Sequence, residues 1–199
     1  VWSFKNSGAL ISSGLGGGSL IYANVLKRKD EKWFKEDLAD GGYKPWVVQY
    51  KQLERHYEEV EKMMNAQKYP LEHQAFEDTK KTLAMIEAAE KLKQENTKCD
   101  FELLNLAVSF RRKNVWKFGF DNQQNPPIIG AEIEEEFPNI HSVQNGFEIP
   151  RSTCRRCGEC DIGCNYGSKN TLDFTYISAA IHKNPKTKIQ PLSEVKEFE

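Results

Sequence analysis

The chain has 199 residues, of which 39% are hydrophobic, and its 28 basic residues are almost balanced by 29 acidic ones. This length allows one domain or two, and the balanced charge argues against a nucleic-acid platform, which would be clearly basic. No stretch approaches the roughly 20 apolar residues of a membrane span, and no signal peptide is visible. We therefore expect a cytoplasmic protein with no nucleic-acid partner and no transmembrane segment.

A glycine-rich turn near the start, Gly14-Leu-Gly16-Gly17-Gly18-Ser19, is the first motif that could bind a ligand. Successive glycines let the backbone approach a ligand closely because no Cβ intervenes, and their N–H groups can form a nest for a phosphate. The motif is not a G-x-G-x-x-G fingerprint, since Ser19 stands at its last position, and it is not a P-loop. Taken alone, it favours a flexible turn over a ligand site.

Two amphipathic helices are predicted after a charged connecting stretch, residues 29–42. Proline restrains its neighbour and removes a helical donor, so Tyr69-Pro70 is expected to separate the two helices. Apolar residues recur at helical spacing on both sides of this break. They are Leu53, Tyr57, Val60 and Met64 in the first helix, and Phe76, Thr79, Leu83 and Ile86 in the second.

Residues 101–110 change to an alternating pattern in which Leu104, Leu106, Val108 and Phe110 are separated by mostly smaller or polar residues. This period of two predicts a strand. Residues 111–150 contain several prolines and little periodicity, so we expect a long irregular segment with at most short strands. Such length inside a compact domain is unusual and often functional.

The cysteines Cys154, Cys157, Cys160 and Cys164 follow, in the spacing C-x2-C-x2-C-x3-C. Bacterial-type ferredoxins use this spacing to hold iron–sulfur clusters, and Gly158 and Gly163 supply the permissive backbone that wrapping around a cluster needs. Four thiolates also suit a tetrahedral zinc ion, and two disulfides would form in an oxidising compartment. We predict that the four cysteines are metal ligands, for a 4Fe-4S cluster or for zinc, with free thiols as the remaining alternative.

A helix is predicted after the cysteines, because Asn170 or Thr171 is a good N-cap and Asp173 lies in the first turn. Asn184-Pro185 is expected to end this helix, and two short strands are expected around Ile189 and over residues 195–198. The side chains expected to face inward are Leu172, Tyr176, Ala179 and Ala180.

The segments described so far, taken in order, resemble the glucose–methanol–choline (GMC) oxidoreductases, in particular their bacterial cholesterol oxidase-like branch. A subset of that branch carries a similar cysteine-rich, ferredoxin-like insertion at the same place. The matching segments are Gly14-Leu-Gly16-Gly17-Gly18-Ser19-Leu20-Ile21, Trp46-Val-Val-Gln-Tyr50-Lys-Gln-Leu53, residues 57–61, residues 167–180 and Lys188-Ile-Gln-Pro-Leu-Ser-Glu-Val195.

The resemblance implies an FAD-dependent enzyme that oxidises a small-molecule alcohol, with a sterol as the family-level expectation, by hydride transfer to the flavin. It places Gly16, Gly17, Gly18 and Ser19 along the cofactor. An asparagine three residues after the serine often lies near the flavin ring in this family. Tyr22 stands at that position here and an asparagine follows at Asn24, so either could face the flavin.

The family's N-terminal FAD fingerprint and its C-terminal catalytic histidine are both missing from these residues. We therefore expect an internal fragment of an α+β type, inactive alone, to which no catalytic residue is assigned. Its expected parts are a flavin-contacting loop and connector (1–42), lid helices with a portion of the substrate domain (43–150), the cysteine motif with its helix (151–185) and returning strands of the FAD domain (186–199).

Two functions remain open at this point. The first is the flavin-dependent alcohol oxidoreductase, in which a cluster could serve as electron acceptor for the flavin and so favour a dehydrogenase over an oxidase. The alternative is a non-catalytic module in which the cysteines bind a cluster or zinc for electron transfer or for structure alone.

Overall fold

The computed structural model describes residues 2–95, 98–118, 123–134 and 151–197, and within them it has a mixed α+β architecture. This confirms the predicted class. The helices are α1 Tyr50–Met63, α2 Lys80–Gln94, α3 Val115–Phe118 and α4 Ser178–Lys183, and the strands are β1 Trp2–Phe4, β2 Ser7–Ala9, β3 Val25–Leu26, β4 Lys35–Asp37, β5 Tyr43–Pro45, β6 Gln67–Lys68 and β7 Asn105–Leu106.

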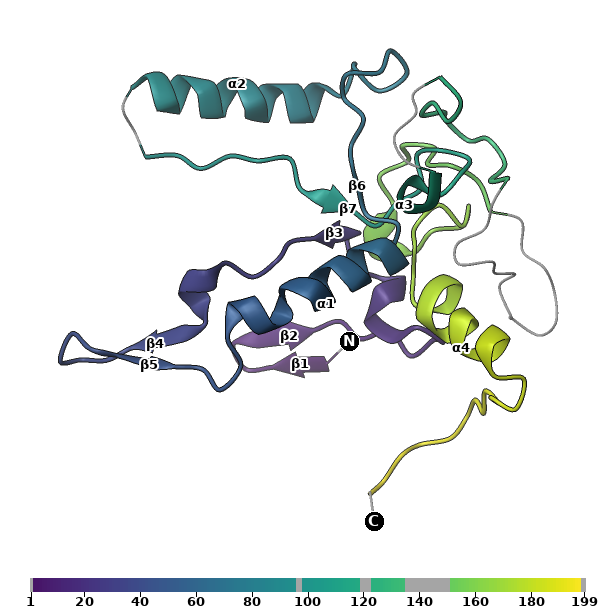
Figure 1. The fold of residues 1–199 in the computed structure, drawn as a ribbon, viewed down its shortest axis with the longest axis horizontal. Helices are drawn as coiled ribbons and strands as arrows, with labels where there is room; N and C mark the ends of the chain where they lie inside the picture. The colour runs from purple at the N-terminus through teal and green to yellow at the C-terminus, as the bar shows by residue number, and fades with distance from the viewer. Residues whose placement is uncertain (1, 96–97, 119–122, 135–150, 198–199) are drawn as a thin grey trace.

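The described strands are short and form three antiparallel sheets, in the orders β1-β2, β3-β7-β6 and β4-β5. In the middle sheet Leu106 lies opposite both Val25 and Gln67, so β7 joins the glycine-turn segment to the segment after α1. Figure 1 shows this sheet near the centre of the molecule, with α2 standing apart above it and the β4-β5 hairpin extending to one side.

The buried core beside this sheet is aromatic. Phe76, Phe110 and Val108 form its centre, and Tyr69 and Cys154 pack against it. The rings of Tyr69, Phe76 and Phe110 meet edge to face with centroids 5.5–5.6 Å apart, a favourable arrangement for aromatic pairs. The first cysteine of the run is therefore anchored in the hydrophobic core.

Helix α1 forms where its period predicts, but the second helix begins later than expected. Phe76 and Thr79 precede α2, which starts at Lys80. Phe76 is fully buried in the core, and Thr79 is the N-cap of α2, with its carbonyl accepting from the Leu83 amide at 3.1 Å and its hydroxyl donating to the Phe76 carbonyl at 3.0 Å. Phe76 has the apolar spacing of α2 but lies in the loop before it, so the sequence prediction wrongly placed it in the helix.

Three other predicted elements differ from the structure. Residues 29–42 are more than a connector, because they contain a short 3-10 helix, Glu31–Trp33, and the strand β4, with Gly41 and Gly42 in the hairpin turn. The predicted strand over 101–110 is confined to Asn105–Leu106. The described residues 186–197 contain no strand, and the rest of the predicted strand over 195–198 lies outside the described residues.

Residues 107–110 do not alternate in burial, because other segments cover both of their sides. Asn24 accepts from the Ala107 amide at 2.8 Å, the Asn170 amide donates to Ala107 at 2.8 Å, and Ser109 binds Ser168 and Cys154 through its backbone. All four residues are consequently buried. Of the predicted irregular segment 111–150, the described parts contain α3, and residues 119–122 and 135–150 lie outside the description.

The helix after the cysteines exists but faces another way than predicted. It opens with a π-helical turn, Asp173–Ile177, in which the Ile177 amide donates to Leu172 five residues back at 2.9 Å, and it continues as α4. This wider turn rotates the register, so Tyr176 and Ala180 are exposed, while Leu172 and Ala179 are half-buried. The buried residues are Asp173, Phe174, Thr175 and Ser178.

Candidate functional site

The glycine-rich turn presents an open backbone edge. Gly16 and Gly17 have φ values of 104° and 54°, in the left-handed region that favours glycine, and a 3-10 helix follows over Gly17–Leu20. Among the described residues, no atom lies within 4 Å of where a Cβ of Gly17 or Gly18 would stand. A ligand can therefore reach this backbone directly.

Ser19 secures the turn rather than pointing into open space. Its Oγ donates to the Gly16 carbonyl at 2.8 Å and accepts from the Leu172 amide at 2.9 Å. The buried carboxylate of Asp173 accepts from the Thr171 hydroxyl, and its Oδ1 lies 3.4 Å from where a Cβ of Gly16 would stand. The start of the π-helical turn is thus fixed against the glycines.

The two candidates for a ring contact, Tyr22 and Asn24, both have their side chains engaged toward the C-terminal half of the chain. The Tyr22 hydroxyl donates to the Asn170 carbonyl at 3.1 Å, and burial, followed by the charge of Cys160, raises its pKa. Asn24 adopts a left-handed φ of 60°; burial raises the pKa of the Cys160 thiol, and hydrogen bonding from the Asn24 side chain lowers it. The Asn24 Oδ1 is buried without a hydrogen-bond partner in the described part of the chain.

The four cysteines of the run converge on one pocket. Cys154, Cys157, Cys160 and Cys164 all line it, together with Val108, Tyr166 and Lys169. The chain can wrap in this way because Arg156, Gly158 and Gly163 have φ values of 60°, 78° and 120°. All five cysteines of the chain are free thiols. The sequence prediction that these loops bring four sulfurs together is consistent with this pocket.

The pocket is lined by the four cysteines but is not a formed metal site in the described residues. In the described part of the chain, no group of three or more His, Cys, Asp or Glu side chains is placed to hold a metal ion. Burial raises the pKa of the Cys154 thiol to about 11, the Arg156 amide lowers it by donating to the sulfur, and the other three cysteines raise it.

Two arginines of the run serve as anchors. Arg156 donates to the Ala75 carbonyl at 2.7 Å and to Asp78 at 2.5 Å, which ties the run to the segment before α2. Arg155 stacks on the Tyr166 ring, with its guanidinium carbon 4.4 Å from the ring centre. Their side chains hold the cysteine loops from outside.

Lys169 joins the two candidate sites and was missed by sequence reasoning. It is 1% exposed, and its ammonium donates to the carbonyls of Leu20 at 2.9 Å, Tyr22 at 3.1 Å and Cys160 at 2.6 Å. Burial lowers the pKa of Lys169, while the nearby Cys160 and Cys164 raise it. A lysine inside a polar run carries no local signal of burial, because lysine is rarely buried.

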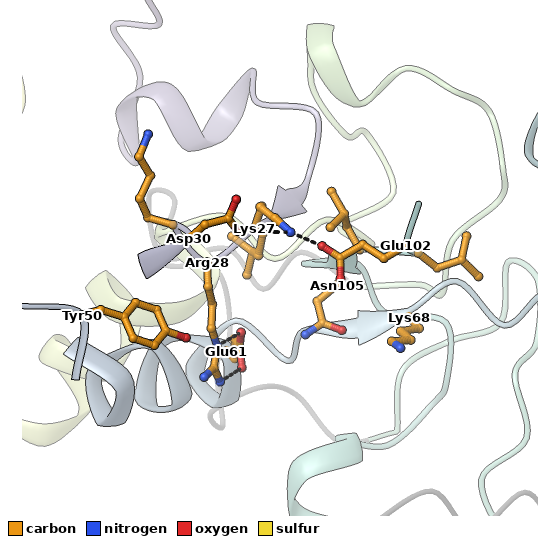
Figure 2. A pocket seen from close by; sticks show the side chains of 12 residues that line it. Lys27, Arg28, Asp30, Tyr50, Glu61, Lys68, Glu102 and Asn105 are labelled. Carbon is orange, nitrogen blue, oxygen red and sulfur yellow. Dashed lines mark hydrogen bonds and ion pairs between the residues drawn. The ribbon is translucent and has the colours of Figure 1, made fainter. Parts of the chain in front are cut away.

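A separate polar pocket lies between β3, α1 and β7. Figure 2 shows Arg28 reaching Glu61 with two of its three guanidinium nitrogens, and Lys27 pairing with Glu102. The Arg28 contacts are 2.8 and 2.7 Å, and the hydrogen bond to Glu61 raises the pKa of Arg28. Residues 33 positions apart give no spacing signal, so the sequence did not reveal this pair.

No helix among the described residues has the length and apolar character needed to cross a membrane.

With this geometry in view, we compared the chain with known proteins. No protein-family model and no solved structure matches it. The chain resembles cholesterol oxidases. The cholesterol oxidase of Acinetobacter baumannii is 26% identical over 175 residues, which is 87% of this chain and 26% of that protein. Those of two Mycobacterium tuberculosis strains are 27% identical over 195 residues, which is 98% of this chain and 28% of each.

The chain thus spans about a quarter of the length of the curated relatives it matches. The similarity to the Mycobacterium tuberculosis proteins extends over nearly all of the chain.

Proposed function

We propose that this chain belongs to a flavin-dependent alcohol oxidoreductase of the GMC type, in which the glycine turn contacts FAD and the four cysteines hold an iron–sulfur cluster. The observation that carries the proposal is the contact between the two segments. Lys169 binds carbonyls of Leu20 and Tyr22, just after the glycine turn, and of Cys160 in the run. The similarity to cholesterol oxidases over 98% of the chain supports the same reading.

The residues of the turn fit a flavin because the open backbone of Gly17 and Gly18 has no side chain in front of it. FAD, when bound, supplies the acceptor for a hydride from the CH–OH carbon of the alcohol. Ser19 holds the turn in shape, and Asp173 adds a buried carboxylate beside Gly16. The chain's own contribution is therefore to bind and orient the cofactor.

The spacing of the four cysteines favours a cluster over a single zinc ion. Structural zinc draws four ligands to one tetrahedral point, whereas each thiolate of a 4Fe-4S cluster binds its own iron, which keeps the sulfurs apart. The four cysteines line one pocket, but no group of three or more ligating side chains in the described residues is placed to hold a metal ion, so the proposal of a cluster rests on the C-x2-C-x2-C-x3-C spacing. The role we propose for the cluster is electron acceptor, and the substrate is an alcohol, with a sterol suggested by the names of the relatives.

The cluster is tested by metal analysis of the anaerobically purified chain. We expect iron and acid-labile sulfide in similar amounts, and slower alkylation of the four run cysteines in the loaded chain. Cys99, which lies outside the run, is the internal control and should react at the same rate with or without the cluster. Zinc without sulfide would replace the cluster by a structural zinc site, and absence of both metals would contradict a metal site altogether.

The flavin contact is tested by Gly18→Ala in the complete gene product. This substitution adds a methyl group to open space at a residue whose φ is not left-handed, so the chain should fold unchanged. The same methyl group would project toward the proposed ligand, and we expect flavin affinity to fall about tenfold or more, measured by fluorescence titration. Unchanged flavin affinity would count against the contact.

Gly17→Ala is the matched comparison. Gly17 has a φ of 54°, so a side chain there is strained whatever the space around it. This variant should lose about 1–2 kcal/mol of stability even without flavin. Loss of flavin in the Gly17 variant alone would indicate a backbone effect rather than a ligand contact.

A non-catalytic metal-binding module is the second candidate. The observation in its favour is that the cysteine pocket is built from this chain's own residues, independently of any flavin. It predicts a complete gene product that binds metal and shows no flavin absorbance, which distinguishes it from the oxidoreductase.

A further inference from the structure

Lys169 is a buried cation whose hydrogen bonds require its charge. Its nitrogen is bonded to the carbonyls of Leu20, Tyr22 and Cys160. All three oxygens are acceptors, so three N–H donors are needed, and only the protonated ammonium has three. The geometry therefore describes Lys169 as positively charged.

The charged groups around Lys169 come from both segments that it joins. The electrostatic influences on it come from Cys160, Cys164, Asp161 and Asp173, and its ammonium also lies 5.2 Å from the ring centre of Tyr22. In the described part of the chain no carboxylate forms an ion pair with Lys169. The side of the pocket lined by the cysteines is thus where negative charge would be stabilised.

Cys160 is the cysteine on which these contacts meet. Its carbonyl accepts from Lys169, which lines the same pocket, and the Asn24 side chain lowers the pKa of its thiol against the rise caused by burial. Both partners belong to or contact the stretch that follows the glycine turn, residues 20–24. Hydrogen bonds to the sulfurs and net local charge are two of the factors that set the potential of an iron–sulfur cluster.

We propose that Lys169 and Asn24 are positioning residues that raise the reduction potential of the cluster through Cys160 and fix this ligand against residues 20–24. The inference rests on the proposed cluster. One-electron reduction adds one negative charge to the cluster and moves no atoms, and a fixed cation in a region of low dielectric stabilises that added charge. A hydrogen bond from the Asn24 amide to the Cys160 sulfur acts in the same direction.

The test uses the full chain reconstituted anaerobically with iron and sulfide, with dithionite as the electron donor. Iron content and reduction potential, followed by electron paramagnetic resonance, are measured for the wild type, Lys169→Met and Asn24→Gly. Glycine is chosen at position 24 because it accepts the left-handed φ of 60° without strain. Lys183→Met, at the exposed end of α4, is the matched control.

We expect Lys169→Met to raise the oxidised-to-reduced ratio at a fixed poise about tenfold, equivalent to a potential about 59 mV lower for a one-electron couple. Asn24→Gly should change the ratio in the same direction by about threefold, and Lys183→Met should not change it. Cluster loading should also slow amide hydrogen exchange over residues 20–24 in the wild type, and less so in Lys169→Met.

The outcomes separate the two claims. A wild-type chain without iron overturns the proposed cluster and this inference with it. A fully loaded Lys169→Met chain with the wild-type potential overturns only the inference. If Lys169→Met does not fold, Asn24→Gly decides, and an unchanged potential in that variant overturns the inference.

Discussion

The cysteine region and the hairpin region of this chain treat polar and apolar groups in opposite ways. Around the cysteines, polar residues such as Ser168, Lys169 and Asn170 are at most 3% exposed. In the hairpin region, Tyr43, Trp46 and Val47 are 62%, 58% and 98% exposed. Burial of polar groups is costly unless they are hydrogen-bonded, so the cysteine region must depend on its hydrogen-bond network for stability. The exposed side chains of the hairpin region contribute little to stability in the described chain.

The largest expected loss of stability follows from a substitution in the aromatic core beside the cysteines. Phe110→Ala removes a ring that packs against Tyr69 and Phe76, and we expect a loss of about 3–5 kcal/mol in the free energy of unfolding. Trp46→Ala in the hairpin region is the comparison, with an expected change of about 0.5 kcal/mol. Denaturant unfolding measures both, and similar losses would show that the two regions do not differ in this respect.

A smaller effect is expected from the buried network. Asn170 donates to the Met64 carbonyl at 2.8 Å, and its Oδ1 accepts from Ser109 and Arg151. Asn170→Ala leaves these groups with fewer partners, and we expect a loss of about 2–3 kcal/mol. The exposed Asn184 provides the control, since Asn184→Ala should change stability by about 0.5 kcal/mol. Equal effects at the two asparagines would argue against the network as the source of stability.

The smallest expected change in stability distinguishes the two ion pairs of the polar pocket. Glu61 is 9% exposed in its side chain and binds Arg28 through two oxygens, whereas the Glu102 side chain is 60% exposed. We expect Glu61→Gln to cost about 1 kcal/mol, because hydrogen bonds to a charged, mostly buried group are weakened. Glu102→Gln should leave the thermal midpoint unchanged, and added salt should not alter that result. A larger loss at Glu102 would contradict the ranking by burial.

Local patterns predicted where some elements form, although Val60 of the predicted apolar face is exposed and Glu61 is the buried residue of α1. The amphipathic period located α1, and the cysteine spacing, together with two glycines, predicted loops that bring four sulfurs to one pocket. The glycine turn also appears where its sequence places it, with Gly16 and Gly17 in left-handed conformations. In each case the signal and its structural effect lie within a few residues of one another.

Contacts between distant segments could not be predicted in this way. Lys169 is buried because carbonyls at positions 20, 22 and 160 surround it, and no property of its own neighbours requires this. Residues 107–110 are buried on both sides because segments from both ends of the chain bind them. The family resemblance pointed to the glycine turn and the cysteines, but not to the lysine between them.

The π-helical turn over Asp173–Ile177 has a consequence for comparing this chain with its relatives. One additional residue in a turn rotates everything that follows without lengthening the helix much. A relative that lacks one residue here could therefore keep the same fold while presenting a different side chain at the position of Asp173. An alignment gap of one residue in this segment would then mark a change in the side chains that face the glycine turn. Insertion or deletion, rather than substitution, would be the evolutionary step that changes these side chains.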